Sequence, residues 1–331
     1  MERGLELVRL LADGDYHSGE AIAARLGISR AAIWKSMVRV RERYGLTIES
    51  VRGRGYRLLA PLELLDAGRI LAILRNQGQA AVSRLEVHDQ IDSTNARLLA
   101  EAQTGAPSGT VCLAERQTAG RGRRGRIWVS PFGANIYLSV LWRYPLPPAA
   151  LGGVSLAAGV AVAAVLREAG IDDLTLKWPN DLLWRRRKLG GLLLEVVGEA
   201  QGPSHLVTGL GLNLRMELGQ GAAIDQPWTD LASAVAGPLV GRNALAARLI
   251  AALCDALERY GRQGLAPFLA DWESLDGLRG ETVSLHLGER VITGTHAGID
   301  PDGALRLDTP EGERSFNAGE VSFSPAKGVS E

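Results

Sequence analysis

Apolar residues recur with helical spacing over the first 44 positions and predict three short helices. The first spans about 5–11, and the second begins after the capping residue Ser18. Gly27 ends the second helix, and Ser29 caps a third that runs from Arg30 to about Tyr44. Two short helices joined by a tight glycine turn are typical of a helix-turn-helix unit.

Two short segments of strand-like pattern follow, over 46–51 and 56–59, and a basic, glycine-containing tip at 52–55 separates them. They predict a β-hairpin, which would complete the unit as a winged helix. From 28 to 57 the chain carries eight Lys or Arg against two Glu, so positive charge gathers where the third helix and the hairpin would meet DNA. The residues predicted to contact DNA are Ser29, Arg30, Trp34, Lys35, Arg39, Arg52 and Arg54. A winged helix used only for protein contacts is the alternative.

Strand-like and helical runs alternate through the middle of the chain, and short strands return near its end. The main predicted strands lie at 87–91, 110–115, 135–141 and 206–214, and the main helices at 96–102, 151–169, 243–260 and 265–275. From 280 onward, short alternating strands between Gly-containing turns predict a small barrel. We therefore predict three domains, at 1–62, 63–274 and 275–331. The pattern alone leaves the middle domain open between α/β and α+β.

The composition is that of an ordinary globular protein and sets few further limits. Thirty-seven basic and thirty-seven acidic residues cancel, so any contact with nucleic acid must be local. Only two cysteines, Cys112 and Cys254, are present, and no signal peptide is visible, so we expect a cytoplasmic location. Residues 144–166 carry no charge, but three prolines interrupt them, so we interpret this stretch as a buried helix and expect no membrane contact.

The first distinctive motif is the loop Gly120-Arg-Gly-Arg-Arg-Gly125, which Arg126 extends. Four guanidinium groups in a short glycine-rich loop predict a lid that orders over an anionic ligand. A solvated loop or a nucleic-acid contact is the alternative. The strand that follows Ser130-Pro-Phe-Gly133 would anchor the loop in a folded core, which favours the lid.

Three further clusters of polar residues accompany the loop. Asp92-Ser-Thr-Asn95 stands at a strand-to-helix junction, where it would cap the helix or bind a polar ligand. Lys177-Trp-Pro-Asn-Asp181 and Lys188-Leu-Gly-Gly191 flank a predicted hairpin, and turn chemistry alone does not explain their lysines. Asn213 is the amide of a buried strand, so it is either satisfied locally or faces a ligand.

In order and spacing, these motifs closely resemble those of the bifunctional biotin protein ligase and biotin operon repressor family. The resemblance spans nearly the whole chain. It implies an α+β multi-domain protein with an N-terminal winged helix-turn-helix. The central domain would be a mixed sheet with helices, similar to class II aminoacyl-tRNA synthetases, and the C-terminal domain a small SH3-like β-barrel.

The resemblance also implies a two-step reaction. The carboxylate of biotin attacks the α-phosphate of ATP to give biotinyl-5′-adenylate, and a carrier lysine then attacks that mixed anhydride. By resemblance, the catalytic residues are Lys188, Arg123 and Arg121. The biotin site would comprise Ser93, Thr94, Asn95, Gln117, Arg121, Gly122, Arg123, Lys188 and Gly191. The ATP and adenylate site would comprise Arg124, Arg126, Trp128, Asn180, Asp181 and Asn213, with Asp181 as a Mg²⁺ ligand.

The partners that the resemblance implies are the biotin carboxyl carrier protein of acetyl-CoA carboxylase and biotin operator DNA. A homodimer of the adenylate-bound form is implied as well, with 192–197 as the edge strand. Two other hypotheses are a biotin-sensing transcription factor without ligase activity, and a ligase whose winged helix no longer binds DNA. The intact loop, Asn180-Asp181 and Lys188 argue against a pure sensor, since sensing needs no nucleotide chemistry.

Overall fold

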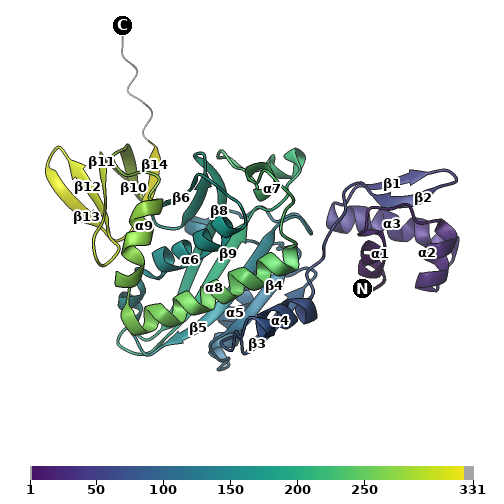
Figure 1. Cartoon of the computed structure of the whole chain (residues 1–331), viewed down its shortest axis with the longest axis horizontal. Helices are drawn as coiled ribbons and strands as arrows, with labels where there is room; N and C mark the ends of the chain where they lie inside the picture. The colour runs from purple at the N-terminus through teal and green to yellow at the C-terminus, as the bar shows by residue number, and fades with distance from the viewer. Residues whose placement is uncertain (1, 324–331) are drawn as a thin grey trace, which may run out of the picture.

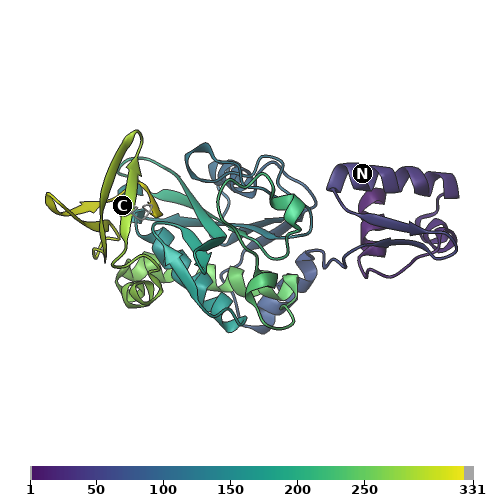
Figure 2. The ribbon, with the colours of Figure 1, turned by 90° about the horizontal axis from the view of Figure 1, so that it is seen from above.

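The structure is a computed structural model and describes residues 2–323, apart from the side chains of Glu2, Arg3, Arg30 and Leu218. Residue 1 of the first predicted domain and residues 324–331 of the third lie outside the described residues. Along the longest axis of the molecule an N-terminal unit, a central domain and a C-terminal β-domain follow one another (Figures 1 and 2). The predicted boundary at 62 follows the last strand of the N-terminal unit, which ends at Leu58. The predicted boundary at 274 lies one residue before the end of the last helix, at Leu275.

The N-terminal unit contains the predicted helices and hairpin. They are α1 (Glu2–Leu11), α2 (Gly19–Leu26), α3 (Arg30–Tyr44), β1 (Ile48–Val51) and β2 (Gly55–Leu58). Ser18 and Ser29 are the N-caps, and each hydroxyl oxygen accepts a bond from a backbone N–H three residues on. Gly27 closes α2 with a φ of 61°, a left-handed conformation that glycine adopts without strain. The winged helix-turn-helix prediction is confirmed.

A seven-stranded mixed sheet forms the centre of the molecule. Its strands are β3 (Arg84–His88), β4 (Thr110–Ala114), β5 (Ile136–Tyr144), β6 (Leu174–Lys177), β7 (Asp181–Trp184), β8 (Arg187–Gly198) and β9 (Ser204–Leu212). Their spatial order is β3-β4-β5-β9-β8-β7-β6, and only the β3–β4 pair is parallel. Strand β7 pairs with β8 only as far as Gly191, so one edge of β8 beyond this point lacks a neighbouring strand within the described chain.

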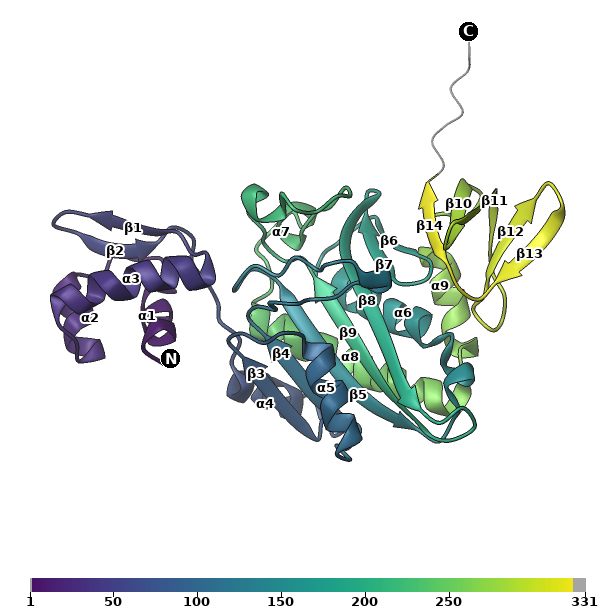
Figure 3. The same ribbon diagram turned by 180° about the vertical axis from the view of Figure 1, so that it is seen from behind.

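Helices cover this sheet unequally. On one face lie α6 (Val154–Glu168) and α8 (Arg242–Gln263), with α4 (Ala67–Asn76) packed against α8 (Figure 1). The opposite face carries α5 (Thr94–Gln103), as the view from behind shows (Figure 3). The short helices α7 (Leu231–Ala234) and α9 (Leu269–Leu275) lie near the ends of the sheet. This is the mixed sheet with helices largely on one side that the resemblance implied.

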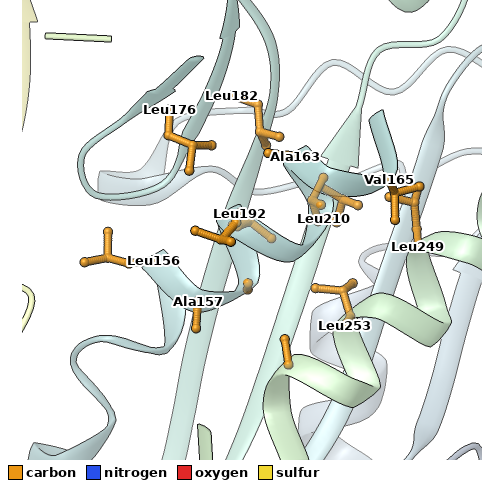
Figure 4. Close-up of a cluster of buried hydrophobic side chains, with 14 of the residues drawn as sticks. Leu156, Ala157, Ala163, Val165, Leu176, Leu182, Leu192, Leu210, Leu249 and Leu253 are labelled. Carbon is orange, nitrogen blue, oxygen red and sulfur yellow. The ribbon is translucent and has the colours of Figure 1, made fainter. Parts of the chain in front are cut away.

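The main core lies between the sheet and the α6–α8 layer. Leucines of the two helices interdigitate with Leu182, Leu192 and Leu210 of the strands (Figure 4). Each fully buried leucine contributes roughly 2 kcal/mol of hydrophobic stabilisation. The helical stretch Pro148–Glu168 is long and apolar enough for a membrane span, but most of it is buried inside the fold, so it is a core helix as predicted.

The C-terminal domain is a five-stranded antiparallel sheet. It contains β10 (Thr282–Leu287), β11 (Arg290–Ile299), β12 (Leu305–Thr309), β13 (Gly312–Phe316) and β14 (Glu320–Phe323), in the order β13-β12-β11-β10-β14. A β-bulge between His296 and Gly298 shifts the β11–β12 register. This confirms the small all-β domain. In this domain, His296 Nε2 lies 2.7 Å from Asp276 Oδ2, and both side chains are fully buried.

Candidate active site

A cavity of about 310 Å³ opens between the N-terminus of α5, the strands β7 to β9 and the Arg/Gly loop. Every residue predicted to bind biotin or nucleotide lines it except Arg124. The cavity therefore gathers four segments that lie far apart in the sequence, namely residues 93–95, 117–128, 177–193 and 209–213.

The start of α5 forms one end of the cavity. Ser93 is the N-cap of this helix, and its hydroxyl oxygen accepts a bond from the backbone N–H of Ala96. Gln117 Oε1 accepts bonds from the backbone N–H of Thr94, at 2.9 Å, and from its hydroxyl, at 3.1 Å. Gln117 Oε1 thus fixes Thr94, and the pair presents neutral donors and acceptors suited to an uncharged polar ring.

Asn95 has a different environment, because its amide atoms already have protein partners. Its Nδ2 donates to Leu193 O at 3.1 Å and to Glu195 Oε2 at 2.8 Å, and its Oδ1 lies 2.6 Å from the hydroxyl of Ser139. A Cβ at Gly209 would lie 2.2 Å from this oxygen, so only glycine leaves room for it. Asn95 lines the cavity mainly as a support that joins α5 to the sheet.

The Arg/Gly loop folds as a small hairpin over the cavity. Gly122 N–H donates to Arg126 O at 2.8 Å, and Trp128 N–H donates to Gly120 O at 2.9 Å. The indole of Trp128 lies directly on Gly211 of β9, where a Cβ would come within 2.4 Å of the ring. Its Nε1–H is buried without a partner among the described residues. A buried unpaired donor is costly, and here it points to a ligand acceptor.

The loop is also attached to the C-terminal domain. Arg123 donates to Gly319 O at 3.0 Å and approaches Asn180 Oδ1 at 3.4 Å. Arg126 forms an ion pair with Glu320, which itself lines the cavity. Burial lowers the pKa of Arg123, because desolvation disfavours its charged form. The C-terminal domain therefore contributes to closing the site, a role that sequence patterns left open.

Arg124 departs from its predicted place. Its backbone has a φ of 56°, and its guanidinium donates to His286 O of the C-terminal domain at 2.6 Å. It also lies 3.8 Å from Glu320. The predicted contribution of Arg124 to phosphate binding thus has no support in this arrangement, since the guanidinium lies outside the cavity wall.

Asp181 is the centre of the charged end of the cavity. It is 7% exposed, and its two carboxylate oxygens lie 2.7 Å from Lys188 Nζ and 2.8 Å from Lys177 Nζ. Burial alone would raise the pKa of Asp181, but the two ammonium groups outweigh this and lower it. Lys188 Nζ also lies 5.7 Å from the ring of Trp128. Positive charge thus stands beside the surface that Trp128 and Gly211 offer.

A further wall segment escaped the sequence interpretation. Residues 223–226 and Trp228 also line the cavity. Lys188 holds this segment through its backbone, since its N–H donates to Pro227 O and its carbonyl accepts from Thr229 N–H, both at 2.9 Å. Asn213 Nδ2 donates to Thr229 O at 3.0 Å, so Asn213 supports the same segment. The run of small residues before Trp228 was the available signal.

Comparison with known proteins identifies the family. Residues 87–213 match the Biotin/lipoate A/B protein ligase family, residues 279–324 the biotin protein ligase C terminal domain, and residues 3–57 an HTH domain. The chain is 44% identical to the bifunctional ligase/repressor BirA of Salmonella typhimurium and 43% identical to that of Escherichia coli. Each match covers 98% of both chains. The chain belongs to the bifunctional biotin ligase/repressor family.

The solved structures agree with this membership. A biotin protein ligase from Aquifex aeolicus, in complex with biotin and ATP, is 30% identical and superposes with a TM-score of 0.62. The match covers 72% of this chain and 98% of that chain. Most residues that line the cavity described above lie within 87–213, the part of the chain that matches the ligase family.

The helix-turn-helix domain of this ligase/repressor presents the predicted basic surface. Lys35, Arg39, Arg52 and Arg54 are exposed, and Trp34 is 63% exposed on α3. The guanidinium of Arg54 stacks on Tyr16 at 4.0 Å from the ring centroid, which orders the hairpin tip. Ser29 uses its hydroxyl as the cap of α3, and the side chain of Arg30 lies outside the described residues.

Proposed function

We propose that this chain forms biotinyl-5′-adenylate from biotin and ATP and then transfers the biotinyl group to a lysine of a biotin carboxyl carrier protein. The observation that carries the proposal is a single cavity with a neutral polar end at Thr94 and Gln117 and a cationic end at Lys188. Biotin has this polarity, with an uncharged ureido ring and a carboxylate. The family membership and the Aquifex aeolicus complex support the same ligands.

The reacting groups would meet at the cationic end. Lys188 would contact the biotin carboxylate and the α-phosphate, and Arg121 and Arg123 would close the loop over them. Trp128 would lie against the adenine, with Asn180 and Asn213 supporting the nucleotide wall. Negative charge grows on the phosphate in the transition state, and fixed cations stabilise it without any proton transfer. Gly191 lies beside Lys188, since a Cβ there would come within 3.3 Å of Lys188 Cε, and its backbone N–H would contact the biotin chain.

Mg²⁺ is the expected companion of ATP, and Asp181 was the predicted ligand. Both oxygens of Asp181 are bound to ammonium groups, and the residues from 2 to 323 offer no cluster of three metal-ligating side chains. The side chains present thus do not fit a Mg²⁺ ion held by the protein alone. Mg²⁺ commonly binds through substrate phosphates with few protein ligands.

Isotope exchange between ATP and pyrophosphate tests the ligase proposal. We expect exchange that depends on biotin in the wild type and a loss of at least 100-fold in Lys188→Ala, because a fixed cation is removed from the transition state. Arg187→Ala is the matched control, since Arg187 is exposed next to Lys188 and outside the cavity. Tight biotin binding without exchange would instead favour the pure sensor.

We propose in addition that the adenylate-bound protein dimerises and binds operator DNA. The edge of β8 from 193 to 198 has no neighbouring strand in the described chain, and Val196 and Val197 are exposed on it. A free strand edge can pair with a second copy and continue the sheet. Sedimentation with and without biotin plus ATP tests dimer formation, and Val197→Arg should weaken it. Selection from random duplexes tests DNA binding by α3 and the hairpin.

A further inference from the structure

The C-terminal domain meets the cavity at its charged end. Residue 303 and segment 319–321 of this domain offer backbone carbonyls and one carboxylate to side chains that line the cavity. The contacts are Lys177 Nζ with Val321 O at 3.3 Å, Trp178 Nε1 with Gly303 O at 3.0 Å, Arg123 with Gly319 O at 3.0 Å, and Arg126 with Glu320. Within residues 2–323, no hydrogen bond or ion pair of this domain reaches Thr94 or Gln117 at the neutral end. The position of the domain therefore affects the charged end and not the neutral end.

A fully buried pair of side chains, His296 of β11 and Asp276 of the segment before β10, holds this domain in place. His296 Nε2 donates to Asp276 Oδ2 at 2.7 Å, and both side chains are 0% exposed. The backbone of His296 adds two bonds at 2.9 Å, because its N–H donates to Glu281 O and its carbonyl accepts from Gly280 N–H. His296 thus binds the segment from 276 to 281 with its ring and with its backbone.

The same segment lies on β6, an edge strand of the central sheet. Gly277 N–H donates to Leu176 O at 3.0 Å, and Asp276 pairs with Leu176 in a parallel bridge. A Cβ at Gly277 would lie 2.6 Å from Thr175 Oγ1, so only glycine permits this close approach. Strand β6 ends at Lys177, whose side chain lines the cavity and contacts the C-terminal domain. Asp276 therefore connects the C-terminal domain to the strand that leads into the charged end.

The polar pair is a costly way to fill this space. His296 Nδ1 is buried and has no partner within the described residues, and an unpaired buried nitrogen lowers the stability of the fold. Well-packed apolar side chains would fill the same volume without that cost. Apolar contacts do not fix an angle, whereas a buried hydrogen bond favours one relative geometry. The pair therefore fits a need for a defined orientation between the domain and β6.

We propose that His296, acting through Asp276, is a positioning residue for adenylate formation. It sets the orientation in which the carbonyls of Gly303, Gly319 and Val321 hold the side chains that would surround ATP. His296 does not line the cavity, so it contacts no reacting group. The proposal rests on the proposed function, since it needs ATP to bind at the charged end. Loss of the pair should therefore weaken ATP binding and leave biotin binding unchanged.

Kinetics of ATP–pyrophosphate exchange, together with calorimetric titration of biotin in the absence of ATP, test this proposal on the full chain. In His296→Leu we expect the KM for ATP to rise about tenfold or more, while the Kd for biotin stays within about twofold of the wild-type value. His296→Gln places a donor amide near the position of Nε2 and should restore most of the ATP affinity. Arg306→Leu is the matched control, since it breaks an exposed ion pair with Glu313 elsewhere in the same domain and should change neither constant.

A purely structural role of His296 predicts a different result. It would lower the fraction of folded enzyme, and with it the exchange rate, but the folded molecules would keep the wild-type KM for ATP. An unchanged KM, or an equal loss of biotin affinity, would overturn the proposal. If His296→Leu does not fold, His296→Leu/Asp276→Leu removes the unpaired buried carboxylate and is judged by the same two constants. Absence of biotin-dependent exchange in the wild type would contradict the proposed function itself, whereas wild-type exchange with an unchanged KM in the variants contradicts only the role of His296.

Discussion

The ring of Phe132 lies 4.3 Å from the ring of Tyr44, centroid to centroid, at an interplanar angle of 41°. Tyr44 is the last residue of α3, and Phe132 follows the Arg/Gly loop of the central domain. Phe132 is 2% exposed and belongs to the hydrophobic cluster of the N-terminal unit. Arg116 adds a second contact, because its guanidinium donates to the carbonyl of Arg43. The segment after the loop thus forms part of the N-terminal core.

Phe132→Ala should therefore loosen the N-terminal unit without removing any proposed ligand contact. Truncation of a buried phenylalanine costs about 3–5 kcal/mol in a protein core. We expect a separate, earlier melting transition in calorimetry and faster proteolysis of residues 59–66. Phe132→Leu keeps most of the volume and should show neither effect. A single unchanged transition in Phe132→Ala would contradict the idea that this contact fastens the two units.

Gly211→Ala and Gly209→Ala should show which end of the cavity binds which substrate. A methyl at Gly211 would displace Trp128, whereas a methyl at Gly209 would displace Asn95. We expect a KM increase of roughly tenfold or more, about 1.4 kcal/mol, for ATP in the first variant and for biotin in the second. Gly219→Ala is the control, since nothing described lies within 4 Å of its added Cβ. Equal effects on both substrates would argue against the assigned ends.

Arg123→Gly should weaken the closure of the loop over the adenylate. Arg123 connects the loop to Gly319 O and approaches Asn180, so its loss removes a contact from both sides of the closed site. We expect premature release of the adenylate and a several-fold rise in biotin on lysines of an added bystander protein. Arg185→Gly, exposed in the β7–β8 turn, should leave selectivity unchanged. Unchanged selectivity in Arg123→Gly would refute the lid interpretation.

Asp181 should also make stability depend on pH in a defined direction. Its pKa is lowered in the folded state, so its pairing stabilises the fold above the unfolded pKa of about 3.9. That contribution disappears as the pH falls through the lower, folded pKa. Urea unfolding should thus show a gap in stability between wild type and Asp181→Asn at pH 7 that narrows below about pH 4. Asp172→Asn, which changes an exposed carboxylate, should show no such gap.

Local patterns in the sequence were sufficient for much of the fold and for most of the proposed site. Ser18, Gly27 and Ser29 act through neighbours within four residues, so their spacing alone predicted the helices of the N-terminal unit. The two lysine motifs and the Arg/Gly loop carried enough chemistry to name the family and most residues that line the cavity. The C-terminal strands followed from alternation and turns in the same way.

The sequence by itself determined which charged and polar groups this protein brings to its site, while the tertiary structure decided how each is used. Asn95 supports the sheet, Arg124 faces the C-terminal domain, and Asp181 holds two lysines at once. Trp228 and Glu320 enter the cavity from segments that the sequence interpretation did not assign to the site. The physical reason is that capping and alternation depend on near neighbours, whereas pairing of buried charges depends on which distant segments the folded sheet brings together.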